Sequence, residues 1–394
     1  MTYDIERVRS AYPALAEGFA LFDGAGGTQM AAPVIDAVAA TMRTAVANRG
    51  DVNEPGRRSG DIVAAARAAV ADLVGGVPGG VVFGPSATAL TYLVARTLSA
   101  RWQPGDEVVV SRLDHDANVR PWVQSGAAVR WADVDRHTGE LPVEQYRELI
   151  GPRTRLVAVT AASNAIGTVP RVRAIADLAH AAGALVYVDG VHATAHRPVD
   201  AVALGADFYV TSAYKWAGPH LAAVVADPAR WEPLVPPKLV PSPGSVPERF
   251  EFGTLSFEML AGLTAAVDHL ATLDTGAGGG RRERVLAGMA AAAAYERGLL
   301  DLLLAGLAAV PGVSLLAAPA DRCPTVSFLV DGQRPAETAA LLGEEGVCVS
   351  AGDYYAYEYF GGGGAVRASI SHYTTAEEVD RLLYCLRKCA IVEG

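Results

Sequence analysis

Short apolar runs alternate with alanine-rich segments of helical periodicity over the first two-thirds of the chain. Each run suits one buried strand, because it is short and bounded by polar or turn-forming residues. Strands separated by helices predict a mainly parallel sheet that is covered on both faces. We expect strands at Val81–Gly84, Glu107–Arg112, Ala127–Trp131, Arg155–Ala161, Ala184–Asp189 and Ala206–Ser212, and helices at Ser86–Ser99 and Arg171–Ala182.

The pattern changes after a proline-rich stretch from Pro233 to Pro247. A helix is expected at Leu255–Leu273, and the small residues Gly276–Gly280 form a hinge before a long alanine- and leucine-rich helix. The remaining segments are typical of a smaller α+β domain: Val313–Leu316, Thr325–Val330, Ala336–Glu345, Gly346–Ser350, Val366–Ile370 and Ala376–Cys389. The predicted organisation is a segment at 1–20 that joins the small domain, a large domain at 21–274 and the small domain at 275–394.

The composition restricts the class of protein. The chain has 394 residues, of which 51% are hydrophobic, so it can form a large core and is not wholly disordered. Its 33 basic and 43 acidic residues give a net charge of −10, which argues against a nucleic-acid partner. A charged N-terminus and the lack of an apolar run of about 20 residues predict a cytoplasmic protein with no membrane partner. The four cysteines form no paired motif, so neither a disulfide framework nor a metal site is expected.

Two predicted strand ends carry residues that suit one cofactor chemistry. Lys215 follows a buried strand, where desolvation would lower the pKa of its amine and make it a nucleophile. Taken alone, this pattern favours a surface lysine that caps a loop. Asp189 ends the preceding strand, and the carboxyl ends of parallel strands meet at one edge of the sheet. Pyridoxal phosphate needs a lysine for its aldehyde and a carboxylate for its ring nitrogen, although Asp189 could instead cap a helix.

Other residues extend this candidate site. Ser86 lies between a strand and a helix N-terminus, where it could hold phosphate or simply cap the helix. Ser212 and His192 lie close to the lysine and the aspartate in the inferred topology, and His115 could stack on a planar ring or be an ordinary loop residue. Arg367 could bind a substrate carboxylate or form a surface salt bridge.

An ordered set of motifs matches a known family. The chain resembles the class V aminotransferases of the fold-type-I pyridoxal phosphate enzymes, and within them the cysteine desulfurase-like branch. The resemblance implies an α/β fold, with a large domain built on a mainly parallel seven-stranded sheet and a smaller α+β C-terminal domain. It runs from Phe22 to His372, and its most specific segments are Asp114–Asn118, Ser163–Thr168, Val188–His192, Ser212–Lys215 and Arg249–Thr254.

The resemblance implies a role for each matching residue. Lys215, His115 and Asp189 would be the catalytic group: the lysine holds the cofactor aldehyde, the histidine stacks on the ring and the aspartate pairs with the ring nitrogen. A homodimer with composite active sites is implied, because Thr254 would reach the phosphate of the neighbouring subunit. The other implied cofactor contacts are Ser86, Ala87, Asn164, His192, Ser212 and Tyr214. The implied contacts to an amino-acid substrate are Ala25, Gly26, Asn48, Arg49, Tyr355 and Arg367.

The departures from the family pattern bear on the reaction. His192 stands where the family often has glutamine, and Tyr214 stands where it often has histidine, so both positions keep a hydrogen-bonding group. Desulfurases of this branch carry a nucleophilic cysteine near the position of Tyr355. Cys348 lies upstream in an apparent strand and is expected to be buried. Without that thiol, a proton can still be removed from the substrate and a β-substituent expelled.

The leading hypothesis is therefore a C–S lyase that acts by α,β-elimination on cysteine or a cysteine-derived amino acid. An amino-acid epimerase or an aminotransferase of the same family is the alternative among enzymes. A non-catalytic scaffold is the alternative outside enzymes, and the joint presence of Lys215, Asp189 and Arg367 argues against it. The tyrosines at 354–359 either form a mobile lid over the substrate or pack the seam between the domains.

Overall fold

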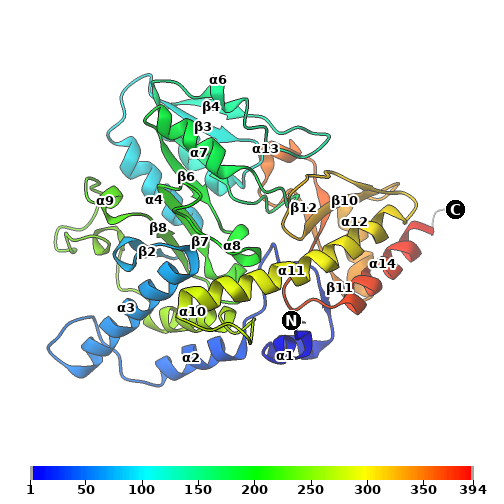
Figure 1. Ribbon diagram of the computed structural model, residues 1–394, viewed down its shortest axis with the longest axis horizontal. Helices are drawn as coiled ribbons and strands as arrows, with labels where there is room; N and C mark the ends of the chain where they lie inside the picture. Colours follow the sequence, from blue (N-terminus) through cyan, green and yellow to red (C-terminus); the bar gives the residue numbers. More distant parts are fainter. Residues whose placement is uncertain (1–2, 392–394) are drawn as a thin grey trace.

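A seven-stranded sheet forms the centre of the computed structural model, which describes residues 3–391 (Figure 1). The strand order is β2-β8-β7-β6-β5-β3-β4, and β8 alone runs in the opposite direction to the other strands. The mainly parallel sheet predicted from the sequence is confirmed. The strands are β2 (Val81–Gly84), β3 (Glu107–Ser111), β4 (Ala128–Ala132), β5 (Thr154–Thr160), β6 (Leu185–Asp189), β7 (Phe208–Ser212) and β8 (Ala222–Val225).

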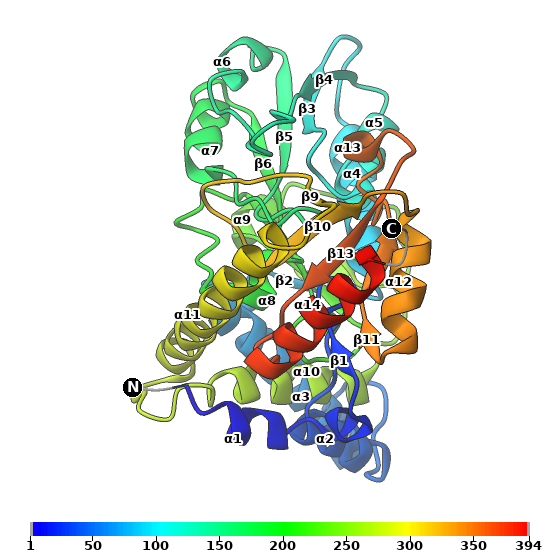
Figure 2. The same cartoon turned by 90° about the vertical axis from the view of Figure 1, so that its right-hand side faces the viewer.

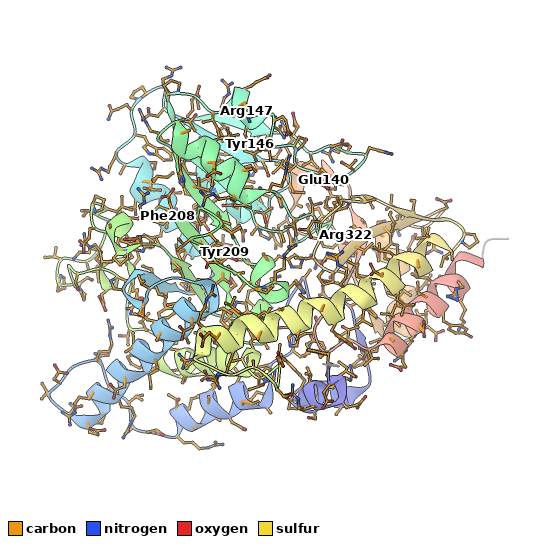
Figure 3. All side chains as sticks on the ribbon, viewed as in Figure 1. Glu140, Tyr146, Arg147, Phe208, Tyr209 and Arg322 are labelled. Carbon is orange, nitrogen blue, oxygen red and sulfur yellow. The ribbon has the colours of Figure 1, made fainter. Side chains whose placement is uncertain are left out.

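Helices cover both faces of this sheet because its strands are apolar on both sides. In β7, Phe208 packs with Trp231 on one face, and Tyr209 belongs to the core of the other face (Figure 3). One face is covered by α4 (Ala87–Ser99) and α5 (Arg120–Val123). The helices that contribute to the other core include α2 (Ala32–Met42), α3 (Glu54–Val74), α7 (Val172–Ala181) and α10 (Phe257–Leu270).

A second, antiparallel sheet lies beside the first, in the order β12-β13-β10-β9 (Figure 2). In β10, Val326, Phe328 and Val330 alternate with Thr325, Ser327 and the exposed Leu329, and they pack against the leucines of α11 and α14. The elements of this region are α11 (Arg281–Ala308), β9 (Val313–Leu315), β10 (Thr325–Val330), α12 (Pro335–Glu344), β11 (Val347–Cys348), β12 (Ser350–Gly352), α13 (Tyr357–Phe360), β13 (Ala365–Ser369) and α14 (Ala376–Ile391).

The N-terminal segment reaches this second region. After α1 (Ile5–Ser10), β1 (Ala20–Leu21) pairs in parallel with β11. The domain boundaries at 20 and 274 stay a prediction, and their outermost residues, 1–2 and 392–394, lie outside the described residues. The remaining helices are short: η1 (Pro13–Glu17), η2 (Pro78–Gly80), η3 (Asp116–Asn118), α6 (Tyr146–Leu149), α8 (Ala193–His196), η4 (Ala213–Lys215), α9 (Pro228–Trp231) and η5 (Glu248–Phe250).

Two details differ from the sequence prediction. The apparent strand Gly346–Ser350 is two strands: β11 pairs with the N-terminal β1, whereas β12 pairs with β13, so the chain changes sheets within it. The antiparallel strand β8 is a further element that the sequence analysis did not identify. Within residues 3–391, no helix combines the length and the apolar character that crossing a membrane requires.

Candidate active site

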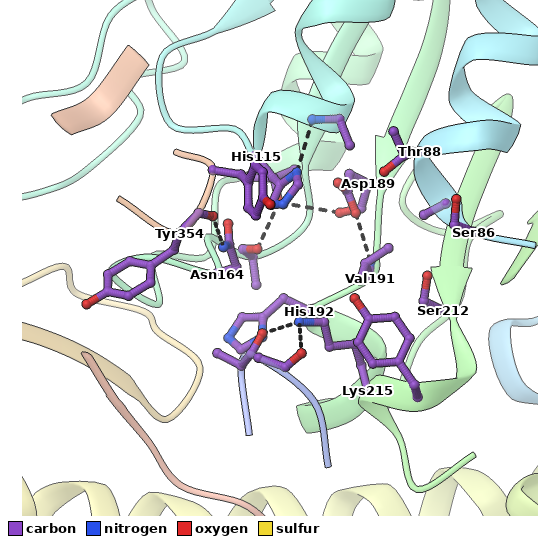
Figure 4. A pocket seen from close by; sticks show the side chains of 18 of the residues that line it. Ser86, Thr88, His115, Asn164, Asp189, Val191, His192, Ser212, Lys215 and Tyr354 are labelled. Carbon is purple, nitrogen blue, oxygen red and sulfur yellow. Dashed lines mark hydrogen bonds between the residues drawn. The ribbon is translucent and has the colours of Figure 1, made fainter. Parts of the chain in front are cut away.

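A cavity of about 300 Å³ lies where the carboxyl ends of the large sheet meet the small sheet (Figure 4). Thr160, Asp189 and Ser212 line it from the ends of β5, β6 and β7, which are neighbours in the sheet. The small sheet contributes Arg367, and the loop after β1 contributes a further wall. The whole lining is Asp23, Ala25, Gly26, Ser86, Ala87, Thr88, His115, Ala117, Thr160, Ala162, Asn164, Asp189, Val191, His192, Ser212, Tyr214, Lys215, Ser350, Tyr354, Tyr355 and Arg367.

Lys215 is buried at this cavity, with 8% of its surface exposed. It ends the short helix η4, which follows β7 directly, so the strand fixes its place. Its Nζ donates hydrogen bonds to the carbonyl oxygens of Gly26, at 3.0 Å, and of Ala25. Burial and the nearby charge of Arg367 lower the pKa of its amine to about 7, against the partial compensation of Asp23 and Asp189. A substantial fraction of the amine is therefore neutral near pH 7.

Asp189 is a buried carboxylate at the end of β6, 7% exposed. Its Oδ1 accepts a hydrogen bond from the amide of Val191 at 2.9 Å, but the following helix, α8, has His192 as its N-cap, so Asp189 does not cap it as the alternative predicted. No Lys, Arg or His within residues 3–391 forms an ion pair with it. Burial raises the pKa of this carboxyl to about 6. A buried carboxylate without an ion-pair partner suits the ring nitrogen of a bound pyridine.

His115 presents a neutral ring to the cavity. Its Nδ1 accepts a hydrogen bond from the amide of Ala117 at 3.0 Å, which places the ring proton on Nε2. Burial and the positive charges of Lys215 and Arg367 lower the pKa of the imidazole to about 4. A neutral planar ring in a half-buried position is suited to stacking on another planar group.

The opposite end of the cavity suits a phosphate. Ser86 caps α4 by accepting a hydrogen bond from the amide of Ala89, and Ser86, Ala87 and Thr88 all line the cavity. The first turn of this 13-residue helix therefore faces the cavity with amide groups and a positive dipole end. Ser212 adds a hydroxyl from the end of β7.

Arg367 is buried in β13, with 4% of its surface exposed, so the alternative of a surface salt bridge is wrong. Its guanidinium donates hydrogen bonds to the carbonyl oxygen of Asn164 and to Oδ1 of Asp23, both at 3.0 Å. It also lies over the ring of Tyr354, with 4.1 Å between Cζ and the ring centroid. Burial lowers the pKa of this guanidinium, which Asp23 opposes. A guanidinium held in this way offers donors to a carboxylate.

His192 joins the cavity to the small sheet. One ring nitrogen, Nε2, bonds Oγ1 of Thr325 in β10 at 3.0 Å, and the other, Nδ1, is buried with no protein partner within residues 3–391. Burial and the neighbouring His196 lower the pKa of the ring, so it is uncharged. Tyr214 stacks on His220 with 4.9 Å between the ring centroids, and Asn164 donates its side-chain amide to the carbonyl oxygen of Tyr354 at 2.9 Å.

The structure does not bring every predicted site residue to this cavity. Thr254 lines a separate hollow of about 620 Å³ with Phe83 and Phe252, and Asn48 and Arg49 lie on the connection between α2 and α3. The sequence analysis missed several lining residues, and the rule that sites form at strand ends would have found Thr160. The missed residues are Asp23, Thr88, Ala117, Thr160, Ala162, Val191, Ser350 and, as a wall of the cavity, Tyr354.

None of the four cysteines, all of which lie in the described part of the chain, lines this cavity. Cys348 in β11 is half-buried, where a buried thiol was expected, and burial raises the pKa of this thiol. Tyr355 lines the cavity with 72% of its surface exposed, whereas Tyr359 is buried in the core. The tyrosine-rich segment thus contributes both to the cavity wall and to the seam.

Comparison with known proteins gives a consistent result. Residues 20–382 match the family model described as aminotransferase class-V. A Mycobacterium tuberculosis protein named only as uncharacterized is 38% identical, covering 98% of this chain and 99% of that protein. A probable cysteine desulfurase of Pseudomonas aeruginosa is 36% identical, with 96% of each chain covered. The crystal structure of the cysteine desulfurase CsdA from Escherichia coli superimposes with a TM-score of 0.87 at 27% identity, covering 98% of each chain.

Proposed function

The chain belongs to the aminotransferase class-V family, whose members depend on pyridoxal phosphate, and on this premise we propose that it is a lyase. The substrate would be cysteine or a cysteine-derived amino acid, and the reaction α,β-elimination with cleavage of the C–S bond. The observation that carries this proposal is a cavity that unites Lys215, Asp189 and Arg367 but contains no thiol.

The residues present suit pyridoxal phosphate. Lys215 would hold its aldehyde, Asp189 its ring nitrogen, His115 one face of its ring, and the α4 N-terminus with Ser86 and Ser212 its phosphate. The unpartnered Nδ1 of His192 and the side chain of Asn164 would contact the phenolic side of the ring. When bound, the cofactor supplies an electron-accepting ring that stabilises negative charge at the substrate Cα.

The chain's own residues account for the rest of the reaction. Arg367 binds the substrate carboxylate and so fixes the direction of the Cα–H bond. Nζ of Lys215, whose amine has a pKa near 7, accepts the proton from Cα. The C–S bond then breaks, the sulfur leaves as a thiol, and water completes the conversion of the remaining atoms to pyruvate and ammonia.

The same cavity does not suit persulfide formation on the enzyme. That reaction needs a thiolate within reach of the substrate sulfur, and the family resemblance puts that thiol near Tyr355, which lines the cavity. Cys348 lies in β11, outside the cavity lining. Elimination needs no such group, so it is the reaction that the side chains present support best.

We also propose that the protein is a homodimer with composite active sites. Thr254 does not reach the cavity of its own chain, and exposed apolar side chains lie around it and along the proline-rich stretch. These exposed side chains are Val235, Leu239, Val240 and Phe252. A second chain that covers them would place Thr254 at the phosphate end of the other subunit's cavity. Sedimentation equilibrium should give twice the chain mass.

Product analysis tests the proposed reaction. The protein loaded with pyridoxal phosphate should convert S-substituted cysteines into equal amounts of pyruvate, ammonia and thiol, and Lys215→Ala should reduce the rate at least about 10³-fold. Retention of the amino acid with solvent deuterium at Cα would instead identify an epimerase, and a 2-oxo acid that keeps the sulfur would identify an aminotransferase. A protein that gains no visible absorbance with pyridoxal phosphate would be a scaffold. Absence of pyruvate with every cysteine derivative overturns the lyase proposal.

A further inference from the structure

The segment between β12 and β13 is attached to the large domain through the carboxylate of Glu358 and through Arg136, which donates hydrogen bonds to the carbonyl oxygens of Glu358 and Tyr359. Glu358, in α13, accepts a hydrogen bond from Nη1 of Arg112 at 3.0 Å and another from Arg120. Arg120 also donates to Oδ1 of Asp116 at 2.7 Å. We call Arg112, Asp116, Arg120 and Glu358 the Glu358 cluster. Only 14% of the Glu358 side chain is exposed, so these ion pairs are screened less than surface pairs.

The Glu358 cluster surrounds the loop that carries His115. Arg112 precedes His115 by three residues and Arg120 follows it by five, so Glu358 bridges the two ends of this loop. The amide of Asp116 donates to the carbonyl oxygen of Tyr355 at 2.6 Å, which attaches the loop directly to the tyrosine backbone. The rings of His115 and Tyr355 lie 5.2 Å apart between centroids and are inclined at 32°.

The backbone at Tyr355 has an unfavourable conformation, so the contacts just described are needed to hold it. Tyr354 and Tyr355 have φ angles of 54° and 58°, in the left-handed region, where a residue other than glycine is strained. The Tyr355 ring is largely exposed, so packing around the ring does not hold it. The hydrogen bonds to the neighbouring backbone and the Glu358 cluster therefore determine where this ring lies.

The remaining lining leaves no charge for a substrate side chain. Arg367 is assigned to the α-carboxylate of the substrate and pairs with Asp23, and Lys215 and Asp189 are assigned to the cofactor. The wall formed by the lining residues that are not assigned to the cofactor includes the rings of Tyr354 and Tyr355, the methyl group of Ala117 and the hydroxyl group of Ser350, none of which is charged. This wall suits an uncharged group, and a flat one gains most because it can stack on the exposed ring.

We propose that Glu358 is a positioning residue that acts through Tyr355 and makes the site selective for amino acids with an uncharged, planar group on the side-chain sulfur. The inference rests on the proposed function, because it concerns the substrate of that same site. Glu358 touches neither substrate nor cofactor; it fixes the backbone that carries the Tyr355 ring, and the ring contacts the substituent.

Binding of two non-reacting analogues tests this proposal. S-benzyl-α-methylcysteine and S-methyl-α-methylcysteine lack the Cα hydrogen, so their affinity can be read from the absorbance of the bound cofactor without elimination. We expect Glu358→Gln to weaken the benzyl analogue about five- to tenfold and the methyl analogue less than twofold, in line with the energy of an aromatic pair. Tyr355→Ala should give the same pattern. The matched control is Glu144→Gln, which removes an exposed glutamate from its pair with Arg171 and should change neither affinity.

The double variant separates positioning from a general effect on the fold. If Glu358 acts through Tyr355, Glu358→Gln combined with Tyr355→Ala should bind the benzyl analogue no more weakly than Tyr355→Ala alone. Additive losses, equal losses for both analogues, or unchanged affinity in Glu358→Gln each overturn the proposal. Should Glu358→Gln fail to fold, equal losses for the two analogues in Tyr355→Ala overturn it as well. Because binding is read without turnover, absence of pyruvate would refute the lyase proposal while leaving this test readable.

Discussion

The cavity has two walls that are built in different ways. Lys215, Asp189 and Ser212 project from the ends of adjacent strands, where hydrogen-bonded ladders fix their spacing. The opposite wall, with Tyr354 and Tyr355, is a loop between β12 and β13 that is held by side-chain contacts and carries left-handed backbone. The strand-end wall holds the groups assigned to the cofactor, and the loop wall holds those that would meet the substrate. The fold therefore provides the rigid part of the site, and a short loop provides its selectivity.

Arg367 lies between these two walls, and after the loss of Lys215 its loss should have the largest effect on the reaction. Arg367→Gln removes the charge-assisted donors from a buried position and leaves Asp23 without its ion-pair partner. We expect kcat/KM for an S-substituted cysteine to fall about 100-fold, mainly through KM, because carboxylate binding is lost. Steady-state kinetics measure both constants.

A control separates charge from geometry at this position. Arg367→Lys keeps the charge but cannot donate two parallel hydrogen bonds, so it should recover only part of the loss. Complete recovery by lysine, or an unchanged KM in the glutamine variant, would show that the substrate carboxylate binds elsewhere.

The two walls differ in how far the sequence predicts them. The strand-end residues can be predicted from the local sequence. An apolar run that ends in Asp189 or precedes Lys215 indicates that the side chain lies at the end of a strand. The loop wall depends on contacts between distant parts of the chain, such as Glu358 with Arg112, which no local periodicity encodes. The family resemblance predicted that Tyr355 lies at the site. It did not predict the backbone conformation of Tyr355 or the ion pairs that hold this loop.

The same distinction explains the errors in the fold prediction. The segment Gly346–Ser350 has the composition of one strand, yet β11 and β12 pair in different sheets because β1 comes from the far end of the chain. The sequence pattern also did not predict that Arg367 is buried, because a single arginine in a strand can face the solvent. In both places the deciding contact lies hundreds of residues away in the sequence.

A smaller effect should come from the charge of Arg367, which lowers the pKa of the Lys215 amine across the cavity. Only the neutral amine of Lys215 can capture the aldehyde of pyridoxal phosphate, with release of water. Because burial and Arg367 lower the pKa of this amine to about 7, the neutral fraction falls tenfold per pH unit below 7 and levels off above it. The rate at which the cofactor-free protein gains absorbance should follow this curve.

The variant Arg367→Gln sharpens that experiment. Removing the second cause of the shift should move the midpoint to higher pH, because less positive charge then opposes protonation of the amine. A rate that keeps rising towards pH 10, as an ordinary lysine would give, contradicts the burial of Lys215 in the cofactor-free protein.

The smallest expected effect concerns the backbone of the loop wall. Tyr355→Gly should leave the free energy of unfolding within about 0.5 kcal/mol of the parent, because relief of left-handed strain offsets the lost ring contact and the added freedom of the unfolded chain. Tyr357→Gly is the matched control: Tyr357 is also exposed but begins α13, so glycine there should cost about 1 kcal/mol. Urea denaturation of the two variants compares them directly. Equal losses would mean that Tyr355 carries no backbone strain, and the loop wall would then be held no differently from the strand-end wall.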